Sequence, residues 1–375
     1  MSADQFQMTF PDSQFRPVRH GDAHYVAAVQ NRKGELMALA NATVDTWERL
    51  TPIVEFVGEK RRSEPYKAET VASWVKRVAN AIGQRPAYFD ILRLRPDHAT
   101  TSSGADPRVL AVIHAAARRR HMSFVPVLPV GRSHSAYVEI VRESAGRDGR
   151  GAALRYPIRT VALLPGMTHT SMLSTALSEI EVDIGHSDVL VDLSYLGPDD
   201  ELHPADVAQA LEDVLAVGDW RSVVLLGTSM PSMLGGEVTE GTVGSIPRRE
   251  WDLWSALRNE PLGRGPTYGD YVIQHPTPPH ADGGPGMRTN IRYTVRDATL
   301  VARGMGPANQ AGREQYRELC EQLVVRSEFA GSGFSWGDAQ ISACASGLSE
   351  PGWHADWRAA GSSHHIRQVT QQLRS

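Results

Sequence analysis

The sequence lacks most of the features that assign a protein to a class at sight. Two cysteines, Cys320 and Cys344, stand among 375 residues, too few for a disulfide framework and without the spacing of metal ligands. No stretch approaches the ~18 consecutive apolar residues that a membrane-spanning helix needs. The amino-terminal segment also lacks the apolar core of a secretion signal. These absences predict a cytoplasmic protein with reduced thiols and no membrane segment.

Charge of one sign is scarce as well. The chain carries 39 basic and 43 acidic residues, which gives a formal charge of −4. Such a balance shows no global preference for nucleic acid or for an anionic membrane. Because net charge averages over the whole surface, a partner protein, a nucleic-acid partner and the oligomeric state all stay open.

Complete catalytic motifs are absent too. The chain has no H-E-x-x-H motif and no G-x-G-x-x-G turn after its first predicted strand. Ser229 lies in G-T-S-M-P, which differs from the G-x-S-x-G elbow of hydrolases, so we expect it to line a site or to cap the next segment. The glycine-rich stretch 233–245 lacks the G-K-S/T ending of a phosphate loop and is expected to be a mobile loop over the site.

What the sequence does contain is a regular alternation of two kinds of segment. Short apolar runs of strand length alternate with amphipathic segments of helix length, as in 68–82, where Val71, Trp74, Val75 and Val78 recur on one helical face. The predicted strands are 25–30, 51–57, 87–94, 124–130, 151–158, 188–196, 222–230 and 268–274. Eight such units over about 250 residues favour a closed (β/α)8 barrel of the TIM type over an open doubly wound sheet.

The alternation of strand-length and helix-length segments also divides the chain into parts. Residues 1–22 are polar and predict a loose amino-terminal arm, and residues 23–275 predict the barrel. Residues 276–375 break the pattern and predict an α+β extension packed on the barrel, with a β-hairpin that turns near Asp297. Its helices are predicted at 310–325 and 364–373, the second capped by Ser362 or Ser363.

Short motifs in a fixed order resemble those of a known family. They are TPIVEF at 51–56, GTSMP at 227–231, R-x-E-W-x-L-W at 248–254, YGDY at 268–271, IRYT at 291–294, FSWGD at 334–338, and W-R followed by HHI between 357 and 366. Each motif alone is weak, but the order and spacing over nearly the whole chain resemble the "protein beta" family, named from a T-even phage protein.

The resemblance implies a biological context for the protein but no particular reaction. The family is defined by sequence, without an established activity, and occurs in phage-related and bacterial anti-phage defence contexts. Its members tend to carry a lysine after the first strand, in the pattern K-x-K-x-G-E. This chain has neutral Gln30 at that position, in the run that ends at Glu35, so a catalytic role for that lysine would not apply here.

In a β/α barrel the working side chains lie at the carboxyl ends of the strands. By position, the candidate catalytic carboxylates are Glu55, Asp90, Asp192 and Asp270. The candidate substrate-binding residues are Arg93, Arg132, Arg155, Ser229 and Arg292. Arginines would hold a phosphate, and carboxylates could hold a divalent metal such as Mg²⁺ or transfer protons. This set favours metal-assisted phosphoester chemistry.

Two other interpretations of these charges stay open. The arginines and carboxylates could pair internally and hold the barrel together, because buried charges need partners. The chain would then be a non-catalytic barrel that binds a protein or a nucleic acid. Among the other candidates, His364 and His365 diverge by ~100° on a helix and do not readily share one ion. Trp251, Trp254 and Trp336 could stack on bases, but their setting favours core packing.

Overall fold

The computed structural model describes residues 20–21, 23–58, 67–92, 94, 107–131, 135–159, 166–277, 288–307 and 312–374. The predicted amino-terminal arm, residues 1–22, lies outside this part of the chain except for His20 and Gly21. Among the described residues, no helix combines the length and the apolar character needed to cross a bilayer.

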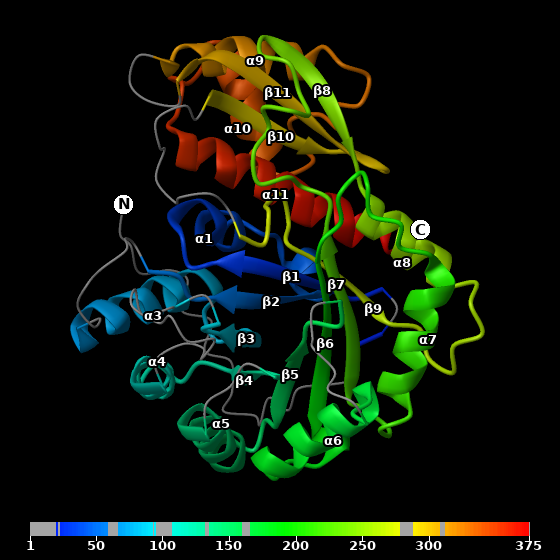
Figure 1. Ribbon diagram of the computed structural model, residues 1–375. Coiled ribbons are helices and arrows are strands. Elements are labelled where there is room, and N and C mark those ends of the chain that lie inside the picture. Colours follow the sequence, from blue (N-terminus) through cyan, green and yellow to red (C-terminus); the bar gives the residue numbers. More distant parts are fainter. Residues whose placement is uncertain are drawn as a thin grey trace.

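Eight parallel strands close into a barrel in the order β1-β2-β3-β4-β5-β6-β7-β9 (Figure 1). They are β1 (Tyr25–Gln30), β2 (Leu50–Glu55), β3 (Ala87–Asp90), β4 (Phe124–Pro129), β5 (Ala152–Tyr156), β6 (Ser187–Tyr195), β7 (Ser222–Thr228) and β9 (Thr267–Asp270). Tyr25 of β1 pairs with Leu50 of β2 on one side and with Tyr268 of β9 on the other, so the sheet has no edge. The predicted (β/α)8 barrel is confirmed.

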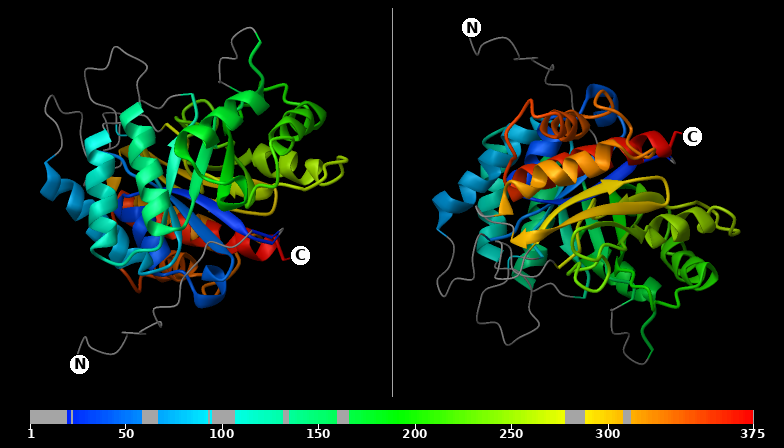
Figure 2. Two further views of the ribbon diagram at one scale, coloured as in Figure 1. Left: turned by 90° about the horizontal axis from the view of Figure 1, so that it is seen from below. Right: turned by 90° about the horizontal axis from the view of Figure 1, so that it is seen from above.

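Helices between the strands cover the outside of the barrel (Figure 2, left). They are α1 (Lys33–Ala40), α2 (Val44–Trp47), α3 (Ala68–Ile82), α4 (Pro107–Arg118), α5 (Ser135–Asp148), α6 (His169–Ile180), the 3-10 turn η1 (Ile184–His186), α7 (Pro204–Leu215) and α8 (Arg249–Leu257). Helix α3 buries the apolar face that its spacing predicts, including Trp74 and Val78. Between β1 and β2 the chain forms two short helices, α1 and α2.

Side chains that alternate along the strands fill the interior of the barrel. Val26, Ile53, Val127 and Leu190, from four different strands, belong to one buried cluster there. The residues between them face outward into a second, larger apolar layer beneath the helices. This alternation decides which of the candidate charges point into the barrel and which point out.

A second sheet stands beside the barrel. Its antiparallel order is β10-β11-β8, formed by β8 (Thr242–Pro247), β10 (Arg288–Thr294) and β11 (Ala298–Pro307). The predicted hairpin around Asp297 is confirmed. The mobile loop expected at 233–245 is wrong from residue 242 onward, because Gly244 pairs with Val301 in a strand that leaves the barrel between β7 and β9. β-branched Thr242, Val243 and Ile246 carry the strand signal that the glycines obscured.

Three helices complete the carboxyl-terminal part: α9 (Gln315–Val324), α10 (Trp336–Ala345) and α11 (His354–Gln372). Helix α11 lies between the barrel and the second sheet and contacts α1, β1 and β10 (Figures 1 and 2). It begins at His354, before the predicted start, and the backbone N–H of Trp353 donates to the Asp356 carboxylate at 2.8 Å. Ser362 and Ser363 are buried inside the helix, so their predicted role as its amino-terminal cap is wrong.

Candidate functional site

The carboxyl ends of five strands meet around one arginine. Arg155, on β5, faces Glu55 at the end of β2, Asp90 at the end of β3 and Asp192 on β6. Tyr271, directly after β9, completes the group. We call these five residues the mouth cluster, because parallel strands of a barrel place their carboxyl ends at one mouth.

The guanidinium of Arg155 is held on all sides by the barrel itself. Its Nη1 donates to Glu55 Oε1 at 2.7 Å and to the Asp90 carboxylate, and its Nε donates to Asp192 Oδ2 at 3.0 Å. Its Nη2 donates to the Tyr271 hydroxyl at 2.6 Å, and that hydroxyl donates to Asp192 at 2.7 Å. Each pair joins elements far apart in the sequence, so the cluster ties the strand ends together.

Local backbone geometry fixes the carboxylates of this mouth. Asp90 Oδ1 accepts from the N–H of Leu92 at 2.7 Å, and Asp192 Oδ1 accepts from the N–H of Ser194 at 2.8 Å. Ser194 adopts φ 61°, a left-handed conformation that side chains seldom occupy. Such turns bind an aspartate to the backbone two residues on and hold its second oxygen toward Arg155.

The mouth cluster is almost closed to solvent. Arg155, Glu55 and Asp90 are 2%, 2% and 1% exposed, whereas Asp192 is 8% exposed. Burial acts to lower the pKa of Arg155, but Tyr271, Asp192, Asp90 and Glu55 outweigh it and hold the pKa well above its ordinary value. Among the described residues, three carboxylates face one guanidinium.

The opposite end of the barrel is arranged differently. Asp188, four residues before Asp192 on β6, pairs with Arg221 through its two oxygens, one of them 2.8 Å from Arg221 Nε. Tyr88 donates to the same carboxylate at 2.9 Å. This buried pair brings one carboxylate to one guanidinium.

Asp270 does not join the mouth cluster. Along β9 the side chains alternate, so Tyr271 faces the interior while Asp270 faces outward, toward α11. Its Oδ2 lies 2.9 Å from His365 Nε2 and accepts from the Tyr268 hydroxyl at 2.9 Å. Its Oδ1 accepts from Tyr25 and from the N–H of Val272 at 2.8 Å. Four donors thus converge on one carboxylate.

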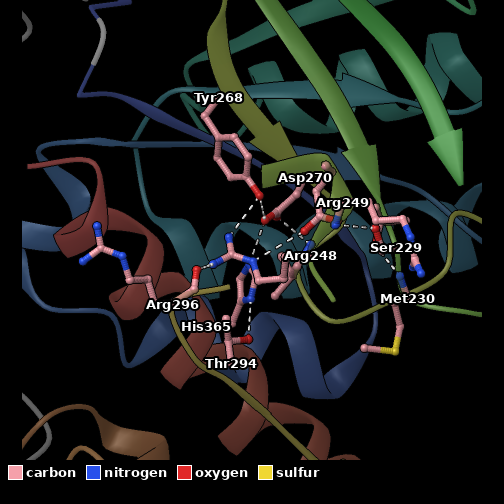
Figure 3. Close-up of polar contacts among 12 residues, drawn as sticks. Ser229, Met230, Arg248, Arg249, Tyr268, Asp270, Thr294, Arg296 and His365 are labelled. Atoms are coloured by element: carbon pink, nitrogen blue, oxygen red, sulfur yellow. Dashed lines mark hydrogen bonds and ion pairs between the residues drawn. The ribbon is translucent and has the colours of Figure 1, made fainter. Parts of the chain in front are cut away.

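His365 connects this carboxylate to the second sheet (Figure 3). Its Nδ1 lies 2.7 Å from the hydroxyl of Thr294 on β10. Burial lowers the pKa of His365, which favours a neutral ring that donates from Nε2 to Asp270 and accepts at Nδ1 from Thr294. Although burial alone would raise it, the pKa of Asp270 is lowered by the His365 and Tyr25 contacts. We call Asp270, His365, Tyr25, Tyr268 and Thr294 the seam network.

Arg248 extends the seam network from the loop before α8. It donates to the Tyr268 hydroxyl at 3.1 Å, and its Nε lies 3.5 Å from Glu250. Nearby, Ser229 Oγ accepts from the N–H of Arg249 at 2.9 Å (Figure 3). The serine hydroxyl therefore caps the start of α8, which was one of its two expected roles.

The neighbouring histidine makes a separate contact. His364 Nδ1 lies 2.9 Å from Asp338 of α10, and its Nε2 lies 2.7 Å from the carbonyl oxygen of Thr294. A carbonyl can only accept, so Nε2 is a donor there. The two adjacent histidines thus point to different partners, as their helical spacing predicts, and both fasten α11 within the protein.

The remaining predicted arginines lie elsewhere. Arg93 and Arg132 fall outside the described residues. Arg292 lies on β10, and its Nη1 donates to the carbonyl of Ile273, away from the mouth cluster. Trp251 and Trp254 pack against Tyr268 in the outer layer, which agrees with core packing and leaves their faces occupied.

A divalent metal fits poorly on the carboxylates that the structure brings together. In the mouth cluster their oxygens converge on the Arg155 guanidinium, in the place where an ion would sit. Within the described ranges, no three His, Cys, Asp or Glu side chains are disposed to hold a metal ion. The carboxylates of the mouth cluster therefore serve as partners of the arginine.

The site contains residues that the sequence patterns did not single out. Tyr271 lies in the YGDY motif, one position after the aspartate that was chosen, and His365 lies in the closing HHI motif. Because side chains alternate along a strand, Asp270 and Tyr271 must point to opposite faces of the sheet. Which of them points into the barrel depends on the register of β9 against β1, which the sequence alone does not give. No local signal connects His365 with a strand 95 residues away in the sequence.

Fold and site together define a (β/α)8-barrel protein with a charged carboxyl-end mouth and a carboxyl-terminal sheet and helices attached to it. The chain belongs to the Beta protein family, whose model matches residues 25–371. No curated protein matches the sequence.

Several solved structures resemble the chain at low identity. The 3-dehydroquinate dehydratase of Enterococcus faecalis is 14% identical over 57% of this chain and 82% of its own, with a TM-score of 0.33. The type I 3-dehydroquinate dehydratase of Clostridium difficile is 11% identical over 70% and 89%, with a TM-score of 0.40. The carboxyl transferase domain of Rhizobium etli pyruvate carboxylase is 11% identical over 63% and 43%, with a TM-score of 0.31. Such similarities transfer no substrate or reaction, and the fold assignment rests on the closed strand order itself.

Proposed function

We propose that the mouth of the barrel binds a ligand that carries a positively charged amine or guanidinium group. The observation that carries the proposal is the gathering of three carboxylates around Arg155 at the carboxyl end of the barrel, where barrels hold their ligands. Carboxylate oxygens accept from the N–H groups of an amine or a guanidinium, as those of the mouth cluster already do from Arg155.

Metal-assisted phosphoester chemistry, the activity expected from these carboxylates, has less support. It needs a divalent ion in a place that Arg155 occupies. A phosphoester is itself anionic and would meet three carboxylates at the mouth. Both considerations favour a binding role, and Asp192, the most exposed of the three at 8%, is the group that a ligand would contact first.

The same charge argument bears on a macromolecular partner. A barrel that binds a protein or a nucleic acid, in a phage-related or defence setting, is the alternative that accompanies the family resemblance. A basic protein segment presents the amine and guanidinium groups that the mouth favours, whereas the phosphates of a nucleic acid would be repelled. The proposal therefore covers a small cationic ligand or a lysine- or arginine-bearing segment.

Thermal unfolding with simple cations tests the proposal. The probes are spermidine, L-arginine and MgCl₂ at matched ionic strength, with the wild-type chain and the variants Asp192→Asn and Asp183→Asn. Asp183 has a side chain that is 92% exposed, so its variant removes the same charge from the open surface. We expect an amine probe to raise Tm by roughly 5 °C at about a hundred times its Kd.

The variants decide where that shift arises. Asp192→Asn is expected to lose at least half of the shift, measured from its own ligand-free Tm, while Asp183→Asn keeps it. Equal shifts in all three proteins, or no shift with either amine, would overturn the proposal. A shift with MgCl₂ alone would also overturn it, in favour of a metal site.

A further inference from the structure

A small cavity lies between the barrel and the second sheet, where neither the mouth cluster nor the seam network uses it. It is lined by Gln274, just beyond β9, by Asn290 and Arg292 of β10, and by His354 and Arg358 of α11. The space open to the centre of a water-sized sphere is about 10 Å³, which is room for about one such group. We call it the seam cavity.

Arg292 faces the seam cavity with most of its donors unused. Its Nη1 donates to the carbonyl of Ile273, and within the described residues no carboxylate forms an ion pair with it. A guanidinium carries five N–H donors, so the one contact leaves the remaining donors near the cavity. Burial and the nearby charge of Arg358 lower the pKa of Arg292 to about 9, although the charge of Glu35 acts to raise it.

Arg358 brings a second positive charge to the same place. It donates to Gln274 Oε1 at 3.0 Å, and its Nη2 lies 3.1 Å from His354 Nε2. Its nearest carboxylate oxygen, Glu35 Oε1, is 3.8 Å away. Glu35 is itself buried, and burial raises the pKa of this carboxyl despite the neighbouring arginine. Two guanidinium groups therefore face one carboxyl that is costly to ionise.

The histidine of the cavity is consistent with this positive setting. Burial, Arg358 and Arg292 together lower the pKa of His354 to about 3, so its ring is neutral and accepts from Arg358. The site thus supplies donors and positive charge, with little negative charge of its own. A half-buried guanidinium with unused donors favours an acceptor, and a group that fills one water-sized space has to be small.

We propose that the seam cavity is an anion site, in which Arg292 and Arg358 hold one small monovalent anion of the size of chloride or of a formate-like carboxylate end. The arginine fork matches a carboxylate, and a halide accepts from the same donors. Sulfate and phosphate exceed the cavity. The site joins the segment after β9 to β10 and α11, so a bound anion would fasten the barrel to the second sheet.

Chloride-35 NMR tests the site directly, because a bound chloride broadens the signal of the free ion. The proteins are the wild type, Arg292→Gln, and the matched control Arg288→Gln from the same strand. Arg288 is 37% exposed and already pairs with Glu240. We expect at least a twofold excess broadening in the wild type and the control, and its loss in Arg292→Gln. Formate should compete it away, and sulfate at equal ionic strength should not.

Two further measurements keep the test decisive. Should Arg292→Gln fail to fold, formate competition on the wild type and the charge-preserving Arg292→Lys still report on the site. Broadening that is equal in both glutamine variants, or that sulfate competes as well as formate does, would overturn the proposal and leave surface association only.

Discussion

His365 Nε2 lies 2.9 Å from Asp270 Oδ2, and this contact joins the strand that closes the barrel to the last helix of the chain. Both side chains are 1% exposed. Asp270 was selected from the sequence as a catalytic carboxylate, yet its four donors engage it within the protein. Its position indicates that the carboxyl-terminal helix is part of the structure that keeps the barrel closed.

Removing the imidazole should therefore destabilise the whole protein. His365→Ala leaves the Asp270 carboxylate buried with one donor fewer and opens a cavity beside it. Removing one hydrogen-bond donor from a buried carboxylate costs ~1.5–3 kcal/mol, to which the cavity adds. Urea unfolding followed by circular dichroism should show a loss of that size. His186→Ala, at a histidine whose side chain is 70% exposed, should change stability by less than ~0.5 kcal/mol. A stable His365→Ala protein would show that α11 is held by other contacts.

Five histidines with lowered pKa values predict that stability falls in mild acid. The pKa of His20 is lowered to about 4, those of His24, His114 and His354 to about 3, and that of His365 is lowered as well, in every case chiefly by burial. The unfolded chain takes up these protons near pH 6.5 and the native chain does not. Their stabilisation is therefore complete above pH 6.5 and is lost toward pH 4 and below, by up to ~1.4 kcal/mol per pH unit for each histidine.

Buried acids act in the opposite sense but are fewer. Burial raises the pKa of Glu35 and Glu250, so the native state binds their protons more tightly and gains stability as the pH falls. Five histidines against two buried acids leave a net loss of stability. Unfolding free energies at pH 7, 6 and 5 should decrease steadily, and a constant or rising value would contradict the assignment of neutral, buried histidines.

Replacing one of these histidines should stabilise the protein. His114, on α4, is 1% exposed, and neither ring nitrogen has a hydrogen-bond partner. Its ring packs against Phe124 with centroids 4.9 Å apart. An unsatisfied buried polar group costs ~1–3 kcal/mol, so His114→Leu should raise the unfolding free energy by ~1 kcal/mol at pH 7. The gain should be larger at pH 5. There the wild type loses stability because the unfolded chain protonates this histidine, and the variant has no such group. His186→Leu, at the surface, should show neither effect.

The fold could be predicted from the sequence, because buried parallel strands leave long apolar runs and amphipathic helices leave a 3.6-residue period. The candidate site could be predicted only in part. Glu55, Asp90, Arg155 and Asp192 were found from their place at strand ends, and they do converge. Asp270 was not separated from them, because the direction of a side chain depends on strand register, which no local pattern fixes.

Long-range contacts explain the other differences. Helix α10 was not predicted, because its glycine, serine and tryptophan content resembles that of a loop and its apolar face is weak. Its packing against α11 supplies what its sequence does not. Strand β8 pairs with β11, whose residues lie more than fifty positions later, so the glycines at 233–245 dominated the local pattern. Tertiary pairing overrides propensity in both segments.

The close crossing of α10 and α11 makes a direct test. A Cβ at Gly337 would lie 2.0 Å from the carbonyl oxygen of Ala360 on α11. Alanine favours a helix by about 1 kcal/mol over glycine, but the overlap is with backbone and the helices would have to separate. Gly337→Ala should therefore lose ~1–3 kcal/mol in urea unfolding. Gly333→Ala, with no atom within 4 Å of its added Cβ, should leave stability unchanged. A stabilised Gly337→Ala protein would contradict the packing.

The two buried arginines of the barrel should respond differently to the same substitution. Arg155→Met removes the single guanidinium among three carboxylates, whereas Arg221→Met removes the partner of one aspartate. Each substitution leaves buried negative charge. One unpaired buried group lowers the free energy of unfolding by ~3–5 kcal/mol. Because three carboxylates repel one another at the mouth, Arg155→Met should exceed that range and yield little folded protein at pH 7. The double variant Arg221→Met, Asp188→Leu should recover most of the stability of its pair, as apolar replacement of a matched pair does. If the Arg155→Met protein unfolds no more easily than the Arg221→Met protein, the three carboxylates of the mouth do not depend on a cation, and the cationic ligand proposed for that mouth loses its support.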